Sequence, residues 1–281
     1  MFMHSPPNYD LHCHSTASDG LLVPAEVVRR AAENGVDILA LTDHDELCGL
    51  AEARAQAAAS GVRFINGVEI SISWGGISIH VVGLNVDPDN PQLQQGLKSI
   101  RQGRTERAKR MSQDLDRVGI PGSLEGAYAY VENPNLIGRT HFARFLVEKR
   151  YVSDVRSAFQ NYLVSGKPGY VPHQWATLQE GLAYIEAGGG VAVLAHPGRY
   201  KLTRAEMRKF IAEFKDRGGV GIEVVTSSHT PEQCLEYAIV AREFGLAASR
   251  GSDFHGPGES RVDLGRLPNL AADLKPVWHD W

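Results

Sequence analysis

Five short segments, far apart in the chain, place histidine or carboxylate side chains beside apolar runs. They are His12-Cys13-His14, Thr42-Asp43-His44, Val68-Glu69-Ile70, Ala195-His196-Pro197 and Ser252-Asp253-Phe254-His255. Imidazole and carboxylate donors without cysteine suit Mn, Fe, Co or Zn rather than Mg alone. Each segment by itself is weak evidence, but five at similar places predict a site that holds several divalent cations.

The first segment has the spacing of a ligand pair. Residues two apart on a strand face the same side, so His12 and His14 can reach one cation while Cys13 points into the core. Asp19 follows in a loop and adds a carboxylate nearby. We therefore expect metal to bind where this strand ends.

Other residues of the set have simpler explanations when each is taken alone. Asp43 is either a cap on the helix that follows or a support for a ligating His44. Glu69 alone would be a surface glutamate, and His80, inside the apolar run 77–82, would be a core residue with its own hydrogen bonds. The Pro-Gly pair after His196 forces a turn at the end of its strand.

Apolar strands and amphipathic helices alternate at both ends of the chain. We expect helices at 24–34, 50–60, 178–187, 205–217 and 231–244, and strands at 9–14, 37–42, 62–70, 77–84, 191–195, 221–225 and 247–251. This alternation predicts an α/β fold with a parallel sheet or barrel, whose functional residues gather where strands end. Residues 95–168 lack clear strands and are rich in Arg and Lys, which indicates an inserted helical subdomain.

Composition limits the classes of function. The 281 residues suit one large domain, or one domain with an insertion, and no apolar run is long enough to span a bilayer. Three cysteines cannot form a disulfide framework, so we expect a reduced, cytoplasmic protein. The net charge of -4 argues against a broad surface for duplex DNA, although a local basic pocket for a small nucleotide or short RNA remains compatible with it.

Taken together, the motifs resemble those of the PHP (polymerase and histidinol phosphatase) family, within the amidohydrolase-like metal barrels. The branch most similar in pattern contains RNase AM and the 3',5'-nucleotide bisphosphate phosphatases, which share the segments 138–143 (GRTHFA) and 167–172 (KPGYVP). The resemblance implies a distorted (β/α)7 barrel made of residues 8–94 and 169–275. Residues 95–168 would form part of the substrate pocket.

The resemblance also implies a trinuclear metal site. His12, His14, Glu69 and Asp253 would hold the first cation. Glu69 would bridge to a second cation held by His80 and His196. The third would be bound by Asp19, His44 and His255. Manganese is the expected metal, with Fe, Co or Zn as alternatives.

The charge of such a site favours phosphate chemistry. Three divalent cations bring six positive charges and the three carboxylates return three negative ones, which leaves a positive surplus. A hydroxide and a phosphate dianion would balance this surplus, whereas an uncharged amide would not. We therefore expect a metal-bridging hydroxide to attack phosphorus while the metals stabilise the phosphate oxygens. An amidohydrolase acting on a neutral substrate is the alternative.

Several polar residues are candidates for contacts to substrate. Arg199 follows His196-Pro197-Gly198 and is expected within reach of the scissile phosphate, so we assign Arg199 and His196 to catalysis. Arginine can grip phosphate with two parallel hydrogen bonds. The substrate-binding candidates are Arg104, Arg139, His141, Asn161, Gln174 and Arg199.

Some of these candidates have plainer explanations. Arg104 belongs to a run with Arg101, Arg107 and Arg110 for which we favour a solvated helix face, although Arg104 could point into the cleft. Tyr170 and Trp175 could stack on a base, but we favour core packing for both.

The predicted activity is removal of the 3'-phosphate from a 3',5'-bisphosphonucleotide, such as 3',5'-bisphosphoadenosine. A 5'-to-3' exoribonuclease acting on short 5'-phosphorylated RNA is a close alternative. Hydrolysis of histidinol phosphate would place the chain on another branch of the family. A non-catalytic metal-binding PHP module is a further alternative, which lost ligands would signal, and this sequence lacks none of them.

Overall fold

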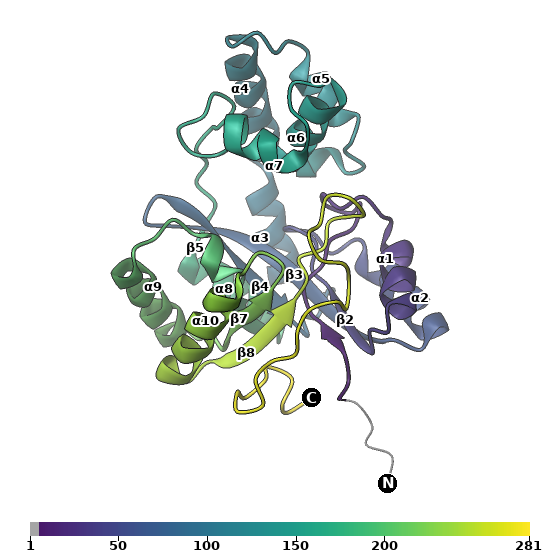
Figure 1. Ribbon diagram of the computed structural model, residues 1–281, viewed down its shortest axis with the longest axis vertical. Coiled ribbons are helices and arrows are strands. Elements are labelled where there is room, and N and C mark those ends of the chain that lie inside the picture. Colours follow the sequence, from purple (N-terminus) through teal and green to yellow (C-terminus); the bar gives the residue numbers. More distant parts are fainter. Residues whose placement is uncertain (1–5) are drawn as a thin grey trace.

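Seven apolar runs of the chain form the strands of one barrel in the computed structural model, which describes residues 6–281 (Figure 1). The strands are β1 (Tyr9–Asp10), β2 (Ile38–Leu41), β3 (Arg63–Trp74), β4 (Ile77–Leu84), β6 (Val191–Leu194), β7 (Gly221–Thr226) and β8 (Ala247–Gly251). A short strand, β5 (Ala176–Thr177), pairs with β3 outside this path. The expected strands are thus present, although β1 is shorter than 9–14 and β3 continues past residue 70.

The barrel is parallel except for one strand. The order is β1-β2-β3-β4-β6-β7-β8, and β4 is antiparallel to both β3 and β6. Beside β8, the amide of Leu11 donates to the Arg250 carbonyl at 3.1 Å, which brings the first and last strands together. The reversal at β4 follows from the turn at Gly75 and Gly76, whose φ angles of 57° and 80° suit glycine. The predicted distorted (β/α)7 barrel is therefore confirmed.

Helices cover the outside of the barrel close to their expected limits. They are α1 (Pro24–Glu33), α2 (Leu50–Ser60), α8 (Leu178–Ala187), α9 (Arg204–Asp216) and α10 (Pro231–Phe244). Local sequence explains their starts. Pro24 occupies the first turn of α1, while α8, α9 and α10 each begin with a threonine in a reciprocal capping box.

Helix α3 (Pro91–Arg101) belongs to the barrel rather than to the insertion. Its residues Leu93, Leu97 and Ile100 pack in the core formed by β3, β4 and the helices that follow β5. A separate apolar core, from Ala108 to Val171, lies within the insertion. The packing therefore places the start of the insertion after α3, later than the expected boundary at residue 95.

The insertion is a small helical layer above the barrel (Figure 1). Its elements are α4 (Arg104–Asp116), α5 (Ser123–Tyr128), η1 (Pro134–Leu136), α6 (Arg139–Glu148), α7 (Val155–Ala158) and η2 (Phe159–Leu163). Polar contacts join it to the barrel. Arg104 pairs with Asp45, and Asn133 donates to Glu46 at 3.0 Å.

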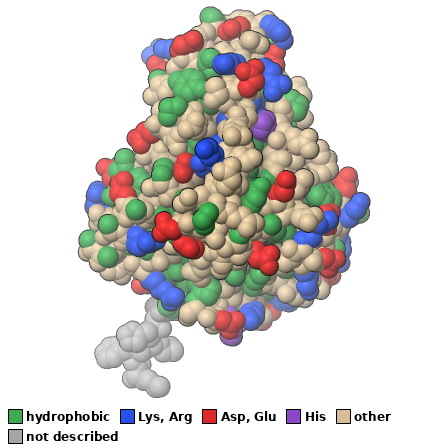
Figure 2. Space-filling model, turned by 180° about the vertical axis from the view of Figure 1, so that it is seen from behind, with side chains coloured by type: hydrophobic (Ala, Val, Ile, Leu, Met, Phe, Trp, Pro, Cys, Tyr) green, Lys and Arg blue, Asp and Glu red, His purple; other side chains and the backbone are tan. Residues whose placement is uncertain are grey.

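The surface is mixed in charge. Figure 2 shows acidic and basic side chains interspersed over one face of the molecule, in keeping with the net charge of -4. Among the described residues, no helix combines the length and the apolar character needed to cross a bilayer.

Candidate metal centre

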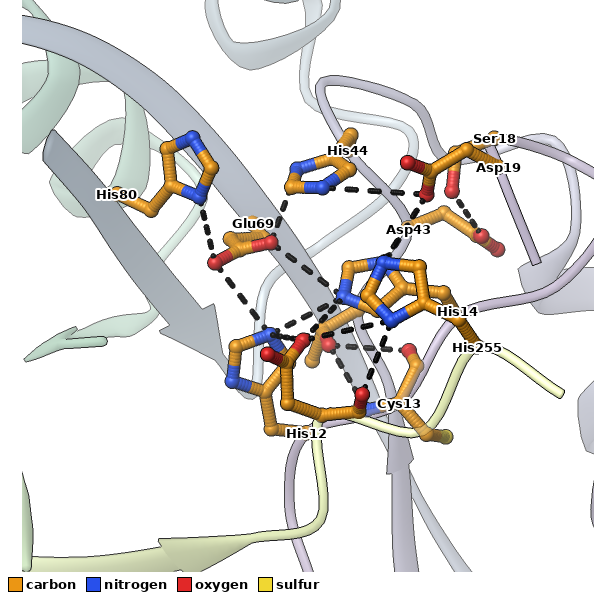
Figure 3. A network of polar contacts seen from close by, with 12 residues as sticks. His12, Cys13, His14, Ser18, Asp19, Asp43, His44, Glu69, His80 and His255 are labelled. Carbon is orange, nitrogen blue, oxygen red and sulfur yellow. Dashed lines mark hydrogen bonds and ion pairs between the residues drawn. The ribbon is translucent and has the colours of Figure 1, made fainter. Parts of the chain in front are cut away.

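All nine expected ligands come together at the end of the barrel that faces the insertion. The segments that follow four strands, β1, β2, β6 and β8, supply the other histidines and Asp253, while Glu69 lies within β3 and His80 within β4 (Figure 3). Glu69 lies inside the strand, within the expected range 62–70, and β3 runs on into its hairpin with β4. The nine side chains are buried or half-buried. They are His12, His14, Asp19, His44, Glu69, His80, His196, Asp253 and His255.

The first group of donors consists of His12, His14, Glu69 and Asp253. His14 Nε2 lies 3.2 Å from Asp253 Oδ1 and 3.4 Å from Glu69 Oε2. His12 Nε2 lies 3.4 Å from Glu69 Oε1. Cys13 turns its sulfur away from the cluster and donates to the Ala40 carbonyl at 3.2 Å, as the strand alternation predicts (Figure 3).

Glu69 joins the first group to a second one. Its Oε1 lies 3.0 Å from both His80 Nδ1 and His196 Nε2. Its Oε2 lies 2.9 Å from His44 Nδ1. One carboxylate therefore faces histidines from four separate segments, which is the geometry of a bridging ligand.

The third group surrounds Asp19. The Oδ1 atom of Asp19 lies 3.4 Å from His255 Nε2, 3.9 Å from His44 Nε2 and 4.0 Å from His14 Nδ1. These separations exceed hydrogen-bond lengths, with one oxygen facing three nitrogens. They leave room for a common partner among the four atoms.

The donor atoms fit divalent cations. Within residues 6–281, His14 Nδ1, Asp19 Oδ1 and Glu69 Oε2 are buried atoms without a hydrogen-bond partner. Leaving a buried polar atom unpaired costs about 1–3 kcal/mol, and the cost is higher for a charged group. Several such atoms in one cluster are explained if cations coordinate them. The absence of cysteine among the donors is compatible with Mn, Fe, Co or Zn.

Burial and neighbouring charges shift the pKa values of the histidines in opposite directions. Burial, assisted by His255 and His44, lowers the pKa of His14 to about 3. Burial would also lower the pKa of His255, but the Asp19 carboxylate outweighs it and raises the pKa to about 9. Because a metal binds the neutral imidazole, cation uptake at the Asp19 group displaces a proton.

Glu223 is a functional residue that the sequence interpretation missed. It is buried in β7, where its Oε1 lies 2.8 Å from His12 Nδ1 and its Oε2 accepts from the His196 amide at 2.6 Å. The carboxylate therefore orients one ligand and holds the backbone of another. The available signal was an acid within the apolar run Gly221 to Val225, since an acid is rarely buried without a partner.

Asp43 supports the loop that carries Asp19. Its carboxylate accepts hydrogen bonds from the Ser15 amide at 2.8 Å, the Ser15 hydroxyl at 2.6 Å and the Ser18 hydroxyl at 2.5 Å. Helix α2 begins instead after Gly49, so Asp43 is not its cap. Asp43 therefore supports the neighbouring loop. In the described part of the chain, no hydrogen bond joins Asp43 to the His44 ring.

Strained backbone conformations occur at the metal end of the barrel. His196, Asp253 and Asp45 have positive φ angles of 29°, 54° and 51°. Such conformations cost on the order of 1–3 kcal/mol each and persist where the surroundings over-determine them. Here each one turns the chain sharply at the metal end of the barrel.

A narrow cavity of about 100 Å³ adjoins the metal ligands and is lined by four arginines. Arg199 comes from the barrel, and its Nη1 lies 2.6 Å from Asp253 Oδ2. Arg104, Arg107 and Arg139 come from the insertion. A larger cavity, of about 530 Å³ beside α2 and α3, contains none of the nine ligands.

Aromatic rings hold the insertion's arginines in place. The guanidinium groups of Arg104 and Arg107 lie 4.7 Å and 5.4 Å from the centre of the Trp175 ring. Arg139 lies 5.6 Å from the Phe159 ring. Trp175 is therefore a platform for cations, and it also packs in the barrel core.

Three expected substrate contacts are not among the residues that line this cavity. His141 is 0% exposed, and its Nδ1 accepts from the Gly138 amide at 3.0 Å, which caps the start of α6. Asn161 and Gln174 are exposed elsewhere, and Gln174 lines other surface hollows. Of the six candidates, the structure brings Arg104, Arg139 and Arg199 to the cavity beside the candidate metal ligands.

Comparison with known proteins places this fold and site in a family. The PHP domain matches residues 10–227, and the chain belongs to the PHP family. It is 50% identical over 273 residues to a 3',5'-nucleoside bisphosphate phosphatase of Chromobacterium violaceum, covering 97% of this chain and 96% of that protein. It is 42% identical over 275 residues to the 5'-3' exoribonuclease Rnm of Escherichia coli, covering 97% and 93%.

Solved structures agree with this assignment. An amidohydrolase from Chromobacterium violaceum with bound sulfate and no metal has a TM-score of 0.94 and 50% identity, covering 97% of this chain and 95% of that one. A putative metal-dependent phosphoesterase from Bifidobacterium adolescentis has a TM-score of 0.83 and 27% identity, covering 98% and 94%. The expected family resemblance is confirmed.

Proposed function

We propose that this protein is a metal-dependent phosphomonoesterase that removes the 3'-phosphate from 3',5'-bisphosphonucleotides. The observation that carries the proposal is the position of four arginines beside nine converging histidines and carboxylates that could hold metal. The ligands define where a phosphate is cleaved. The arginines define a substrate with more negative charge than a single phosphate group.

We assign three divalent cations to the three donor groups, with manganese as the expected metal. When bound, the cations supply an activated water near neutral pH and neutralise the charge on the phosphate oxygens. Three divalent cations and the three carboxylates among the nine ligands would together leave a surplus of positive charge that suits a phosphate. The presence of every expected ligand also counts against a non-catalytic module.

Arg199 is suited to contact the phosphate that is cleaved. Its side chain is 49% exposed at the mouth of the cavity, although one nitrogen pairs with Asp253. The remaining guanidinium donors are available to a phosphate oxygen. His196, which lies three residues earlier, contributes as a ligand rather than as a proton carrier, because burial lowers its pKa to about 3.

The second phosphate of the substrate would bind to the insertion. Arg139 and Arg107 face the cavity from two helices, and burial lowers the pKa of Arg107 to about 9. Both guanidinium groups lie against aromatic rings, and neither forms an ion pair with a carboxylate among the described residues. A phosphate dianion in the cavity would therefore give them an anionic partner. We therefore expect a bisphosphate to be preferred over a simple phosphate ester.

The relatives favour one alternative substrate. The protein similar at 50% identity is named for nucleoside bisphosphates, whereas those from Escherichia coli and Haemophilus influenzae, at 42% and 43%, are named 5'-3' exoribonucleases. Both reactions act on a nucleotide that has a 5'-phosphate, and both free this nucleotide from the group linked to its 3'-oxygen. Short 5'-phosphorylated RNA is therefore the second candidate.

Turnover of a substrate panel with added Mn tests these proposals. We expect phosphate release from 3',5'-bisphosphoadenosine and compare it with nucleotide release from a 5'-phosphorylated oligoribonucleotide. If only histidinol phosphate is hydrolysed, the substrate has been assigned to the wrong branch. A His196→Ala variant should lose turnover, and wild-type rates in that variant would contradict the metal assignment.

A further inference from the structure

The insertion contacts one of the three donor groups directly. Thr140, at the start of α6, donates from its hydroxyl to Asp19 Oδ2 at 2.8 Å. This bond leaves Asp19 Oδ1 facing His14, His44 and His255, and in the part of the chain that the structure describes this atom has no hydrogen-bond partner. Thr140 therefore determines which carboxylate oxygen points toward the cation position.

A second contact from the same helix holds the backbone of Asp19. Arg144 lies one turn after Thr140 and donates to the Asp19 carbonyl at 2.6 Å. Its guanidinium also pairs with both oxygens of Glu259, at 2.8 Å and 2.9 Å, and its side chain is 5% exposed. A buried two-pronged ion pair of this kind orders both of its partners.

Glu259 connects this contact to another ligand of the group. It belongs to the turn that follows His255, where the Ser260 hydroxyl accepts from the His255 amide at 2.7 Å. The Leu21 amide, close to Asp19, donates to the His255 carbonyl at 2.6 Å. Helix α6 therefore contacts two chain segments, one near each end of the sequence, that supply the ligands Asp19 and His255.

The other two donor groups are held by the barrel. Glu223 binds His12, Tyr200 accepts from the His80 amide at 2.9 Å, and Arg199 pairs with Asp253. Within residues 6–281, the hydrogen bonds to these ligands come from barrel residues. The insertion therefore has a selective contact with the Asp19, His44 and His255 group.

We propose that docking of α6 onto the barrel assembles this third group, so that its affinity for a divalent cation depends on the position of the insertion. The inference rests on the proposed three-metal site. Thr140 acts as a positioning residue for Asp19. Because coupling between two events is reciprocal, a cation at this group also stabilises the docked insertion, which carries Arg104, Arg107 and Arg139.

Metal binding to three threonine variants tests the proposal. Thr140→Val removes the hydroxyl at nearly constant volume, Thr140→Ser retains it, and Thr105→Val changes an exposed threonine of α4 as a matched control. Titration with Mn, followed by calorimetry and metal analysis, reports stoichiometry and affinity. We expect Thr140→Val to weaken one of three sites about 10- to 100-fold, the range found when a residue that orients a ligand is lost. Thr140→Ser should restore that site.

Hydrogen exchange supplies a readout that does not depend on catalysis. Mn should slow amide exchange across 139–148 in the wild-type protein and much less in Thr140→Val. If Thr140→Val still binds three Mn ions with undiminished affinity, and Mn still protects α6 from exchange, the coupling is overturned but the trinuclear site is not. A wild-type protein that binds fewer than three Mn overturns the trinuclear site and the coupling with it. An unchanged melting temperature of the metal-free variant shows that it has folded.

Discussion

The metal end of the barrel and the insertion are built from different interactions. The metal ligands sit on or beside strands whose apolar side chains form continuous cores. The insertion has its own apolar core but meets the barrel through polar groups, such as Arg104 with Asp45 and Arg144 with Glu259. We therefore expect the barrel to hold the reaction centre and the insertion, with its own apolar core, to supply charges that recognise substrate.

This difference predicts which substitutions affect reaction and which affect selectivity. Changes among the barrel ligands should reduce turnover of every substrate. Changes among the insertion's arginines should affect substrates according to their charge. The following predictions test that division, from the largest expected effect to the smallest.

Glu69→Gln should cause the greatest loss. The Glu69 carboxylate faces histidines of all three donor groups, and glutamine cannot bridge two cations with two anionic oxygens. We expect turnover to fall by on the order of 10²–10³-fold, the scale for losing a main electrostatic stabiliser of the transition state. Steady-state assays with excess Mn measure the loss. Glu26→Gln, at an exposed position of α1, is the matched control and should retain full activity.

Arg139→Met should alter selectivity instead. Hydrogen bonds to charged groups contribute about 1.5–3 kcal/mol, so KM for 3',5'-bisphosphoadenosine should rise roughly 10- to 100-fold. Hydrolysis of p-nitrophenyl phosphate, which has no second phosphate, should change little. Arg156→Met, on the exposed side of α7, serves as the control. Equal losses on both substrates would place Arg139 in the chemistry and erase the distinction between the two regions.

Glu223→Gln should weaken metal binding about tenfold without unfolding the barrel. The carboxylate accepts from two donors, the His12 ring and the His196 amide. A glutamine offers only one acceptor oxygen and turns its amide group toward the other donor. Mn titration measures the affinity, and circular dichroism verifies the fold. Unchanged affinity would show that the strand ends alone orient these ligands.

The ion pair between Arg30 and Asp263 should matter least, because it is partly exposed to solvent and includes none of the nine metal-ligand candidates. The hydrogen bond from Arg30 lowers the pKa of Asp263. The resulting stability is present above the unfolded pKa of about 3.9 and is lost as pH falls through the folded value. Both side chains are about one-third exposed, so Asp263→Asn should cost under about 1 kcal/mol at pH 7. Urea unfolding at pH 7 and at successively lower pH measures the difference, which should shrink as the pH falls below the unfolded pKa.

Much of the fold could be predicted because local patterns are strong in the barrel. Helices α8 and α10 begin at threonine caps and have apolar faces, and their observed limits match the expected ones. The insertion boundary was harder to predict. Helix α3 has the composition of the insertion's helices, but Leu97 and Ile100 pack in the barrel core, a contact that no local pattern contains.

The candidate site was predictable for its ligands and less so for its other residues. Motifs such as His12-Cys13-His14 place two donor side chains at the two-residue repeat of a strand, so they can be identified from the sequence. His141 lies within an equally distinctive segment, yet its ring is buried as a helix cap. Glu223 lacks any motif, and its importance follows from two partners that are distant in sequence.

The sequence by itself determined the donor types, the strand-helix alternation and the family to which the chain belongs. These properties depend on residue identity and on spacing over a few positions. Only the tertiary structure showed that Thr140 orients Asp19, that Glu223 joins two ligands, and that Trp175 supports two arginines. Such contacts join residues far apart in the chain, and they exist only once the barrel has closed and the insertion has docked on it.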